Sequence, residues 1–277
     1  MYTYIAAFLT LACNYKCPYC INRMGSFKHR KSMSGDDWIR ALSRIDTSTN
    51  LPITLQGGEP TLHPDFYRIV RTLYLHGKYM DILTNFNIDY TKWLSEIPTR
   101  AFSRPSKYPG IRVSYHPGQS SILGLFLACY RASRVGYSIG IWAVDHPAHR
   151  NRVRILQAIA TSLGLEFRKK EFLGWYDHAF YGEYKYEDAV SQKDTKCVEC
   201  KSNELLIAPD GVLHRCHADL YANRNPIGHI LDATLPKIGV YRPCTYYGQC
   251  NACDIKLKTD RFQRGGFCSV EIRSLDN

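Results

Sequence analysis

Three cysteines near the N-terminus, Cys13, Cys17 and Cys20, are separated by three and two residues. They follow the apolar run Tyr4 to Leu11, which predicts a buried strand. Structural zinc takes four protein ligands, and cubane iron–sulfur clusters are usually held by four thiolates. Three thiols on one short loop therefore predict a metal site with one position left open, and this is where we expect the chemistry.

A second motif, Gly57-Gly58-Glu59-Pro60, follows the next predicted strand. Two adjacent glycines let the backbone come close to a ligand and expose its carbonyl and amide groups. Taken alone, the same four residues also form ordinary turns. The position of the motif, one strand after the three-cysteine loop, favours a joint binding site.

Both motifs lie among alternating strand and helix patterns that run from residue 4 to about residue 170. This alternation predicts repeated βα units around a parallel sheet, arranged as an open doubly wound sheet or as a partial barrel. Ser34 with Asp37 predicts a helix start, and Gly77 and Gly164 predict helix ends. The expected strands are Tyr4–Thr10, Ile53–Gln56, Met80–Thr84, Ile111–Tyr115, Ser138–Val144 and Leu165–Arg168, and the expected helices are Ser34–Ile45, Pro64–His76, Tyr90–Ile97, Ser120–Ala132 and Arg150–Leu163.

Ligands of parallel α/β folds bind where the carboxyl ends of the strands open into loops. A histidine at such a place can act as an acid or base on a substrate, and it can equally be a turn residue without catalytic duty. We therefore regard Tyr115, His116 and His146 as catalytic candidates. The other polar residues at these strand ends are Thr84, Asn85 and Ser114.

The last part of the chain is rich in cysteine. Disulfides are rare in the cytosol, and unligated thiols are prone to oxidative damage, so we expect these thiols to bind metal. Cys129, by contrast, lies alone in an apolar stretch, which predicts a buried structural thiol. An aromatic, turn-rich segment at 173–194 predicts a linker between a core at 1–172 and a cysteine-rich tail at 195–277. The seven tail cysteines are Cys197, Cys200, Cys216, Cys244, Cys250, Cys253 and Cys268.

Length and composition restrict the class of protein. The chain has 277 residues, of which 45% are apolar and 22% charged, enough for one large domain or one domain with a small appendage. Its formal net charge of +11 permits acidic or phosphate-bearing partners without naming one. Because the chain has no apolar run of about 20 residues and no signal-peptide pattern, we expect a cytoplasmic protein without membrane attachment.

The three-cysteine loop, with the aromatic Tyr19 before its last thiol, resembles the cluster loop of the radical S-adenosylmethionine (radical SAM) superfamily. The resemblance implies a partial (β/α)6 TIM-like barrel and a 4Fe-4S cluster on Cys13, Cys17 and Cys20. It implies that S-adenosylmethionine binds the fourth iron, with Tyr19 near the adenine. By the same resemblance, the cofactor-binding residues are Gly57, Gly58 and Glu59 for the methionine amino group and Thr84, Asn85 and Ser114 for the carboxylate or ribose.

The tail resembles the auxiliary-cluster domain called SPASM or, when shortened, twitch, through Cys200, Gly211 and Cys216 and a later pair of cysteines. Tyr241 stands where the full pattern has its next cysteine. The resemblance implies one or two auxiliary 4Fe-4S clusters. One assignment takes Cys197, Cys200, Cys216 and Cys253 for one cluster and leaves Cys244, Cys250 and Cys268 for a second; the shorter pattern takes Cys200, Cys216, Cys250 and Cys253 for a single cluster.

The resemblance implies that a reduced cluster splits S-adenosylmethionine and that the 5′-deoxyadenosyl radical removes a hydrogen from the substrate. An auxiliary cluster that accepts an electron would make the reaction an oxidation, so we expect oxidative modification of a peptide, as in the maturation of ribosomally made peptides. We also expect an electron donor such as flavodoxin or ferredoxin. Because the sequence starts at its first barrel strand, peptide recognition is expected from the tail or from a separate protein.

Two other functions stay open from the sequence. One is a radical SAM dehydrogenase or epimerase of a small polar molecule, such as a sugar or aminocyclitol, which a short twitch-like tail would suit. The other is a non-enzymatic zinc and nucleic-acid-binding module, in which Cys197, Cys200, Cys250 and Cys253 form a zinc ribbon.

Overall fold

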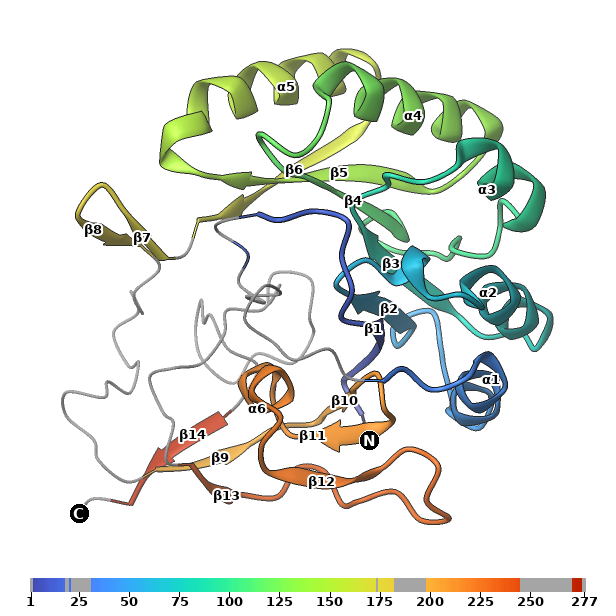
Figure 1. Ribbon diagram of the computed structural model, residues 1–277, viewed down its shortest axis with the longest axis vertical. Coiled ribbons are helices and arrows are strands. Elements are labelled where there is room, and N and C mark those ends of the chain that lie inside the picture. The colour runs from blue at the N-terminus through green and yellow to red at the C-terminus, as the bar shows by residue number, and fades with distance from the viewer. Residues whose placement is uncertain are drawn as a thin grey trace.

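The structure, a computed structural model, describes residues 2–17, 20, 31–172, 174–181, 198–244 and 271–275. Its main feature is a nine-stranded sheet in the order β12-β11-β10-β1-β2-β3-β4-β5-β6 (Figure 1). Neighbouring strands from β10 through β1 to β6 are parallel, whereas β11 and β12 are antiparallel additions. The chain therefore follows the βα pattern that the sequence predicts, and one further parallel strand lies beside β1.

The core strands are β1 (Tyr4–Thr10), β2 (Ile53–Gly57), β3 (Met80–Thr84), β4 (Ile111–Tyr115), β5 (Ile139–Asp145) and β6 (Glu166–Glu171). The helices between them are α1 (Gly35–Ser43), α2 (Phe66–Leu75), α3 (Tyr90–Glu96), α4 (Ile122–Val135) and α5 (Arg150–Ser162). The later elements are β7 (Gly174–Tyr176), β8 (Ala179–Tyr181), β9 (Val198–Lys201), β10 (Glu204–Ile207), β11 (Val212–His214), α6 (His217–Ala222), β12 (Pro226–His229), β13 (Arg242–Cys244) and β14 (Glu271–Ser274). Two short 3-10 helices, Pro60–Leu62 and Pro147–His149, follow β2 and β5.

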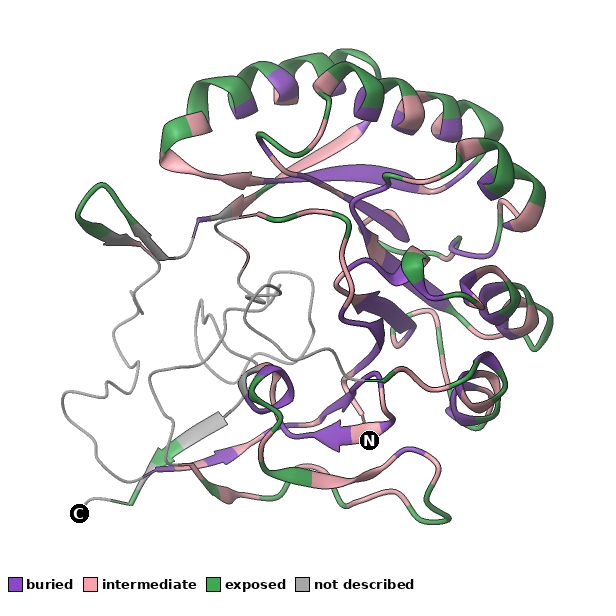
Figure 2. Cartoon of the chain, in the orientation of Figure 1, coloured by how far each residue is buried: buried purple, intermediate pink, exposed green. Residues whose placement is uncertain are grey.

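Helices α1 to α5 cover one face of the curved sheet, which becomes the outer face of a partial barrel (Figure 1). Figure 2 shows these helices buried on the side toward the sheet and exposed on the other. Alternate residues of β1 separate the two faces: Ile5, Ala7 and Leu9 belong to the core beneath the helices, whereas Ala6 and Phe8 point to the inner face. The helix-covered core contains Cys129, whose thiol is fully buried, as the sequence predicts.

The six strands and five helices expected for the core are confirmed, with shifts of a few residues at their ends. Ser34 is the N-cap of α1 and accepts a hydrogen bond from the Asp37 amide, at 3.1 Å. The helix expected to end at Ala132 continues to Val135, because Gly136 supplies the left-handed conformation, with φ of 106°, that ends it.

The tail contributes directly to the main sheet. Strand β10 pairs in parallel with β1 over Tyr4 to Ala7, so residues about 200 positions apart in sequence are neighbours. On the inner face, Phe8 packs with Leu206 of β10 and with Leu220 and Tyr221 of α6. The sequence analysis did not predict this strand, and the division into a core and a separate tail domain stays a prediction.

Two smaller sheets lie beside the main one. Strand β9 pairs with β13 and β14, and β7 and β8 form a hairpin within the segment expected as a linker. Asp177 and His178 form the hairpin's two-residue turn, both with positive φ, as tight hairpin turns require. Within the described ranges, no helix is both long and apolar enough to cross a membrane.

Candidate functional site

The three-cysteine loop begins where β1 ends, at the carboxyl edge of the parallel sheet. The Thr10 hydroxyl accepts a hydrogen bond from the Ala12 amide at 3.1 Å, and Cys13 Sγ accepts one from the Tyr15 amide at 3.4 Å. The Cys20 amide donates to the Cys17 carbonyl at 3.1 Å. These local bonds hold Cys13 directly after β1 and keep the backbones of Cys17 and Cys20 together.

Gly57 and Gly58 allow the end of β2 to lie directly against the end of β1. The Gly58 amide donates to the Thr10 carbonyl at 2.9 Å. A Cβ atom on Gly57 would lie 2.0 Å from the Thr10 carbonyl oxygen, and one on Gly58 would lie 2.2 Å from the Ala12 carbonyl oxygen. The sequence analysis attributed the glycines to ligand approach; the structure adds a second reason, which is the close contact of two backbones beneath the cysteine loop.

Glu59 joins the ends of β1, β2 and β3. Its carboxylate is fully buried and accepts hydrogen bonds from the Thr84 hydroxyl at 2.7 Å and the Asn85 amide at 2.6 Å. It also accepts from the amide and hydroxyl of Thr61, at 3.2 and 2.7 Å. Burial raises the pKa of Glu59, and these hydrogen bonds act against that rise. The carboxylate is thus occupied by the protein's own donors and holds the loops in place.

Asn85 continues this connection to the cysteine loop. Its side-chain amide donates to Asn14 Oδ1 at 2.6 Å and lies 4.0 Å from Cys13 Sγ. Asn14 in turn donates to the Asn87 carbonyl at 3.3 Å. The loop after β3 therefore fixes the position of the first thiol through side-chain amides.

The loop after β4 contacts the cysteine loop from another side. Gln119 Oε1 accepts a hydrogen bond from the Lys16 amide at 3.0 Å, and the His116 ring packs edge-on against Tyr15 with ring centroids 6.1 Å apart. The cysteine loop is thus held by residues from four successive strand ends, which is the arrangement expected of a site at the carboxyl edge of a parallel sheet.

The donor set suits a metal cluster held by thiolates. Burial and the adjacent Cys20 and Cys13 thiols raise the pKa of Cys17 to about 12, and burial is the main cause that raises the pKa of Cys13. Thiols this close compete for protons until a metal cation compensates their charge, so metal binding would release protons. In the described part of the chain, no three Cys, His, Asp or Glu side chains are gathered tightly enough to hold a metal ion.

The inner face beside this site carries Gln56, the last residue before the two glycines. Gln56 lies opposite Phe8 in the β1–β2 pairing and is 8% exposed. Its side-chain Nε2 is buried and has no hydrogen-bond partner among the residues that the structure describes. A buried donor without a partner costs about 1–3 kcal/mol, so its presence at this edge indicates a position that a ligand can satisfy.

The catalytic candidates occupy different environments. Tyr115 lies in the core beneath the helices, where burial raises its pKa and Arg152 of α5 acts against the rise. Ser114 is on the inner face, opposite Trp142 in the β4–β5 pairing. Burial, and to a lesser degree Lys170, lowers the pKa of His116 to about 4, so its imidazole is neutral near pH 7. The structure thus brings His116, but not Tyr115, to the cysteine loop.

His146 lies farther along the edge, in an aromatic cluster. Its ring is 4.4 Å from that of Phe172 and 4.9 Å from that of Tyr176, between centroids, and its Nδ1 accepts from the Ala148 amide at 3.2 Å. Burial, followed by the neighbouring His149, lowers its pKa. No described contact joins His146 to the cysteine loop.

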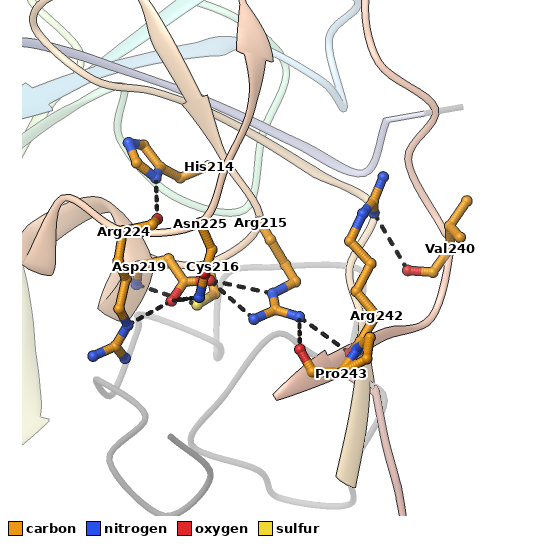
Figure 3. Close-up of polar contacts among 9 residues, drawn as sticks. All are labelled: His214, Arg215, Cys216, Asp219, Arg224, Asn225, Val240, Arg242 and Pro243. Carbon is orange, nitrogen blue, oxygen red and sulfur yellow. Dashed lines mark hydrogen bonds and ion pairs between the residues drawn. The ribbon is translucent and has the colours of Figure 1, made fainter. Parts of the chain in front are cut away.

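In the tail, Arg215 and Asp219 form a buried polar network beside Cys216 (Figure 3). Arg215 Nε and Nη2 donate to Asp219 Oδ2 at 3.2 and 3.1 Å, and Arg215 Nη1 donates to the carbonyls of Arg242 and Pro243 at 3.1 and 2.9 Å. Cys216 is the N-cap of α6, and its Sγ accepts from the Asp219 amide at 3.4 Å. Cys200 is buried on β9, where it lies opposite Arg242.

Some predicted site residues lie outside the described residues: Tyr19, Cys197, Cys250, Cys253 and Cys268. Their roles stay predictions. The sequence analysis in turn missed residues that the structure places at the sites, namely Asn14, Gln56, Gln119 and Arg215. Asn14 and Arg215 stand directly beside a cysteine in the sequence, which is a usable signal, but Gln56 and Gln119 carry none.

Comparison with known proteins identifies the first part of the chain. Residues 8–92 match the family model of the radical SAM superfamily. They include the three thiols, the two glycines, Glu59 and Asn85, which the structure joins at one edge of the sheet. This segment belongs to the radical SAM superfamily. The family implies a 4Fe-4S cluster and S-adenosylmethionine, and the assignment of that cluster to Cys13, Cys17 and Cys20 stays a prediction.

Relatives of known activity resemble parts of this chain. It is 36% identical to an S-adenosylmethionine-dependent nucleotide dehydratase of Selenomonas ruminantium over 78 residues, which are 28% of this chain and 27% of that protein. It is 26% identical to a PqqA peptide cyclase of Methylobacterium nodulans over 182 residues, 62% of this chain and 47% of that protein. The chain thus spans less than half the length of these curated relatives.

Solved structures share the fold of this chain. Streptococcus suis SuiB bound to its precursor peptide SuiA superposes with a TM-score of 0.55 at 13% identity, over 84% of this chain and 63% of that one. Native anSMEcpe with bound AdoMet and Kp18Cys peptide gives a TM-score of 0.57 at 17% identity, over 84% and 78%. At these identities the likeness concerns the fold, a partial TIM-like barrel.

Proposed function

We propose that this radical SAM protein oxidatively modifies a peptide, as a maturase of ribosomally made peptides. The observation that carries the proposal is the joined site at the carboxyl edge of β1 to β4, where Glu59 and Asn85 fix a three-thiol loop. The peptide as substrate is supported by relatives, because PqqA peptide cyclases match in sequence and SuiB and anSMEcpe match in fold with peptides bound.

Cys13, Cys17 and Cys20 would hold the 4Fe-4S cluster, and the Gly57–Glu59 segment with Thr84, Asn85 and Ser114 would contact S-adenosylmethionine. When bound, these groups supply a 5′-deoxyadenosyl radical that removes a hydrogen from the substrate. The chain's own part is to hold the loop in one geometry through Asn14 and Gln119 and to exclude water with the apolar inner face around Phe8. Among the candidates for acid–base work, His116 is the one that contacts the loop.

The finer parts of the proposal concern the tail and the partners. We assign 195–277 to a SPASM or twitch-like domain with one or two auxiliary 4Fe-4S clusters, joined by a linker at 173–194 to a core at 1–172. The cysteine content supports a reducing compartment, the cytoplasm. A flavodoxin or ferredoxin would donate electrons, and a separate protein is a candidate for peptide recognition.

Anaerobic reconstitution with iron and sulfide tests the proposal. About 8 irons per chain would indicate one auxiliary cluster and about 12 would indicate two, at four irons per cubane cluster. Reduction with dithionite in the presence of S-adenosylmethionine should yield 5′-deoxyadenosine. Cys17→Ala should abolish that product, whereas Cys129→Ala, which removes a buried thiol far from the loop, should retain it. If the protein binds zinc and forms no 5′-deoxyadenosine, the non-enzymatic zinc and nucleic-acid-binding module is the remaining function.

Substrate class is tested by the same assay with candidate substrates. The expected result for an oxidation that removes two hydrogens is deuterium transfer from a labelled peptide into 5′-deoxyadenosine, with loss of 2 Da from the unlabelled peptide. Transfer from a sugar or aminocyclitol instead would favour the small-molecule dehydrogenase or epimerase. The match to a nucleotide dehydratase does not decide between them, because it covers 28% of this chain.

A further inference from the structure

Helices α4 and α5 expose apolar side chains on their outer sides, which together we call the α4–α5 face. The two helices are neighbours, because α4 packs on β4 and β5 and α5 packs on β5 and β6 (Figure 1). Leu123 and Leu127 of α4 are 71% and 44% exposed, and Ile155 and Ile159 of α5 are 61% and 43% exposed. Each pair is separated by four residues, so its members lie one above the other on the same side of their helix. Single exposed apolar residues are normal, but two such pairs on adjacent helices indicate an interaction surface.

The charge of this part of the chain has one sign. Residues 97–165 contain nine lysines and arginines and one acid, Asp145, which gives a formal charge of +8 out of the +11 of the whole chain. Neither α4 nor α5 contains an acidic residue. Their exposed cations are all arginines: Arg131, Arg134, Arg150, Arg152 and Arg154.

Most of these arginines have no counter-charge on the protein itself. Arg150 lies 4.0 Å from the Asp145 carboxylate. In the part of the chain that the structure describes, Arg131, Arg134 and Arg154 form no ion pair. At about 100° per residue, Arg131 lies on the same side of α4 as Leu127, opposite the residues that the helix buries. The α4–α5 face therefore combines apolar side chains with unneutralised guanidinium groups.

This combination determines the chemistry of the partner. Arginine is enriched in protein interfaces, where its planar guanidinium group binds carboxylates in a bidentate manner. A positive face attracts a partner of negative charge and repels a second copy of the same face, which argues against a symmetric dimer. Membrane-surface helices commonly insert aromatic rings, and sites for single-stranded nucleic acid stack bases on them. Here Phe126 and Tyr130 of α4 pack in or against the core, and α5 has no aromatic residue.

We propose that the α4–α5 face binds an acidic amphipathic helix of a separate protein. The apolar side of that helix covers the leucine pair and the isoleucine pair, and its carboxylates pair with the arginines around them. Two exposed helices on a sheet offer a third helix the ridges and grooves that helix packing requires. The inference goes beyond the proposed function, because it requires neither an iron–sulfur centre nor S-adenosylmethionine.

The test measures binding of a synthetic probe to the full chain by fluorescence anisotropy. Helix α4 has 14 residues and spans about 21 Å, so a labelled peptide of about 20 residues is long enough to cover it. The probe consists of leucine, alanine and glutamate, with the leucines along one side of the helix. A peptide of the same composition with scattered leucines is the first control, and a peptide with lysine in place of glutamate is the second.

Four variants of the face remove either an apolar side chain or a charge: Leu127→Ser, Ile155→Ser, Arg131→Glu and Arg154→Glu. Two matched controls make the same chemical changes elsewhere. Leu75→Ser changes a leucine of α2 that is 79% exposed, and Lys237→Glu reverses the charge of an exposed lysine after β12. Because all six positions are exposed, urea titration of each variant should give the unfolding midpoint of the parent.

The expected result is micromolar binding of the glutamate probe, which weakens as salt is added because the charges are exposed. Each of the four variants of the face should raise the Kd about tenfold, since each removes one apolar or charged contact from a small interface. Leu75→Ser and Lys237→Glu should stay within about twofold of the parent. Equal binding of either control peptide, or equal losses in the two control variants, would overturn the proposal.

Further arms of the test identify other occupants of the face. Binding to anionic lipid vesicles or to an RNA oligonucleotide that Arg131→Glu abolishes, or a dimer in analytical ultracentrifugation that Leu127→Ser dissociates, would overturn the proposal. A raised KM of Arg131→Glu for a peptide substrate, with no other protein present, would assign the face to the substrate and contradict a separate partner. The anisotropy measurement needs no turnover, so its outcome does not depend on whether the protein forms 5′-deoxyadenosine.

Discussion

Single side-chain amides determine where the first thiol lies. Asn85 contacts Asn14 and Cys13 through its side chain, while its backbone amide is anchored on Glu59. Asn85→Ala removes the first two contacts and leaves the anchor, at a cost of about 1 kcal/mol per hydrogen bond. We expect a chelator to extract iron from the first cluster about tenfold faster than from wild type.

Asn87→Ala is the control for this measurement, because Asn14 uses the backbone carbonyl of Asn87 and not its side chain. An extraction rate for Asn85→Ala equal to that of Asn87→Ala would show that the Asn85 amide does not hold the loop.

His116 makes stability depend on pH. Its folded pKa of about 4 lies below the ordinary value of 6.5, so the unfolded chain takes up a proton that the folded chain refuses. The free energy of unfolding should therefore fall as the pH falls from about 6.5 to about 4, by up to about 3 kcal/mol. His116→Gln should remove this part of the pH dependence in urea titrations, whereas the exposed His76→Gln should retain it.

Replacing the buried polar side chain of Gln56 by an apolar one should raise the free energy of unfolding. Gln56→Met keeps the side-chain volume and removes the buried Nε2, for which the described part of the chain offers no partner. We expect the ligand-free protein to gain about 1 kcal/mol in free energy of unfolding, measured by urea titration. A loss of stability would mean that the amide already has a satisfied structural role.

At the scale of elements, β3 and β4 are joined by a buried ionic cluster away from the cofactor edge. Asp81 of β3 accepts from Arg104 at 3.0 and 2.8 Å, and Arg112 of β4 lies 3.5 Å from the same carboxylate. Tyr108 covers both guanidinium groups. Asp81→Asn removes the carboxylate charge that both buried guanidinium groups share and should cost about 3–5 kcal/mol of unfolding free energy.

The control for Asp81 is Asp36→Asn, which removes the carboxylate of an exposed ion pair with Arg68. Exposed pairs contribute little, so its unfolding curve in urea should match that of wild type. Similar losses in both variants would refute the role assigned to burial.

The elements were more predictable from the sequence than their contacts. The spacing of apolar residues and the glycines at helix ends were enough to predict the core strands and helices, because the local sequence pattern determines these elements. Strand β10 escaped prediction because its partner β1 lies about 200 residues away and its short apolar run stands among cysteines. Likewise, the two glycines were recognised, but the clash that requires them depends on the carbonyls of Thr10 and Ala12, which only the folded chain brings near.

At the scale of the whole molecule, the pairing of β10 with β1 predicts that tail and core unfold together. Leu206 of β10 is fully buried, and Leu206→Ala should cost about 2–5 kcal/mol. Because Trp38 and Trp93 are buried under the core helices, tryptophan fluorescence should report a lower unfolding midpoint. Val240→Ala, an exposed tail position, is the control, and an unchanged fluorescence midpoint in Leu206→Ala would indicate a tail that unfolds independently.

The same pairing sets an order of events during synthesis of the protein. Strand β1 leaves the ribosome about 200 residues before one of its two neighbours, β10, which ends at Ile207. Until then one edge of β1 presents unpaired backbone groups, which are a template for pairing with other chains. We therefore expect the nascent chain to depend on chaperones while the residues between β1 and β10 are translated, and slow translation of this interval to favour aggregation over folding.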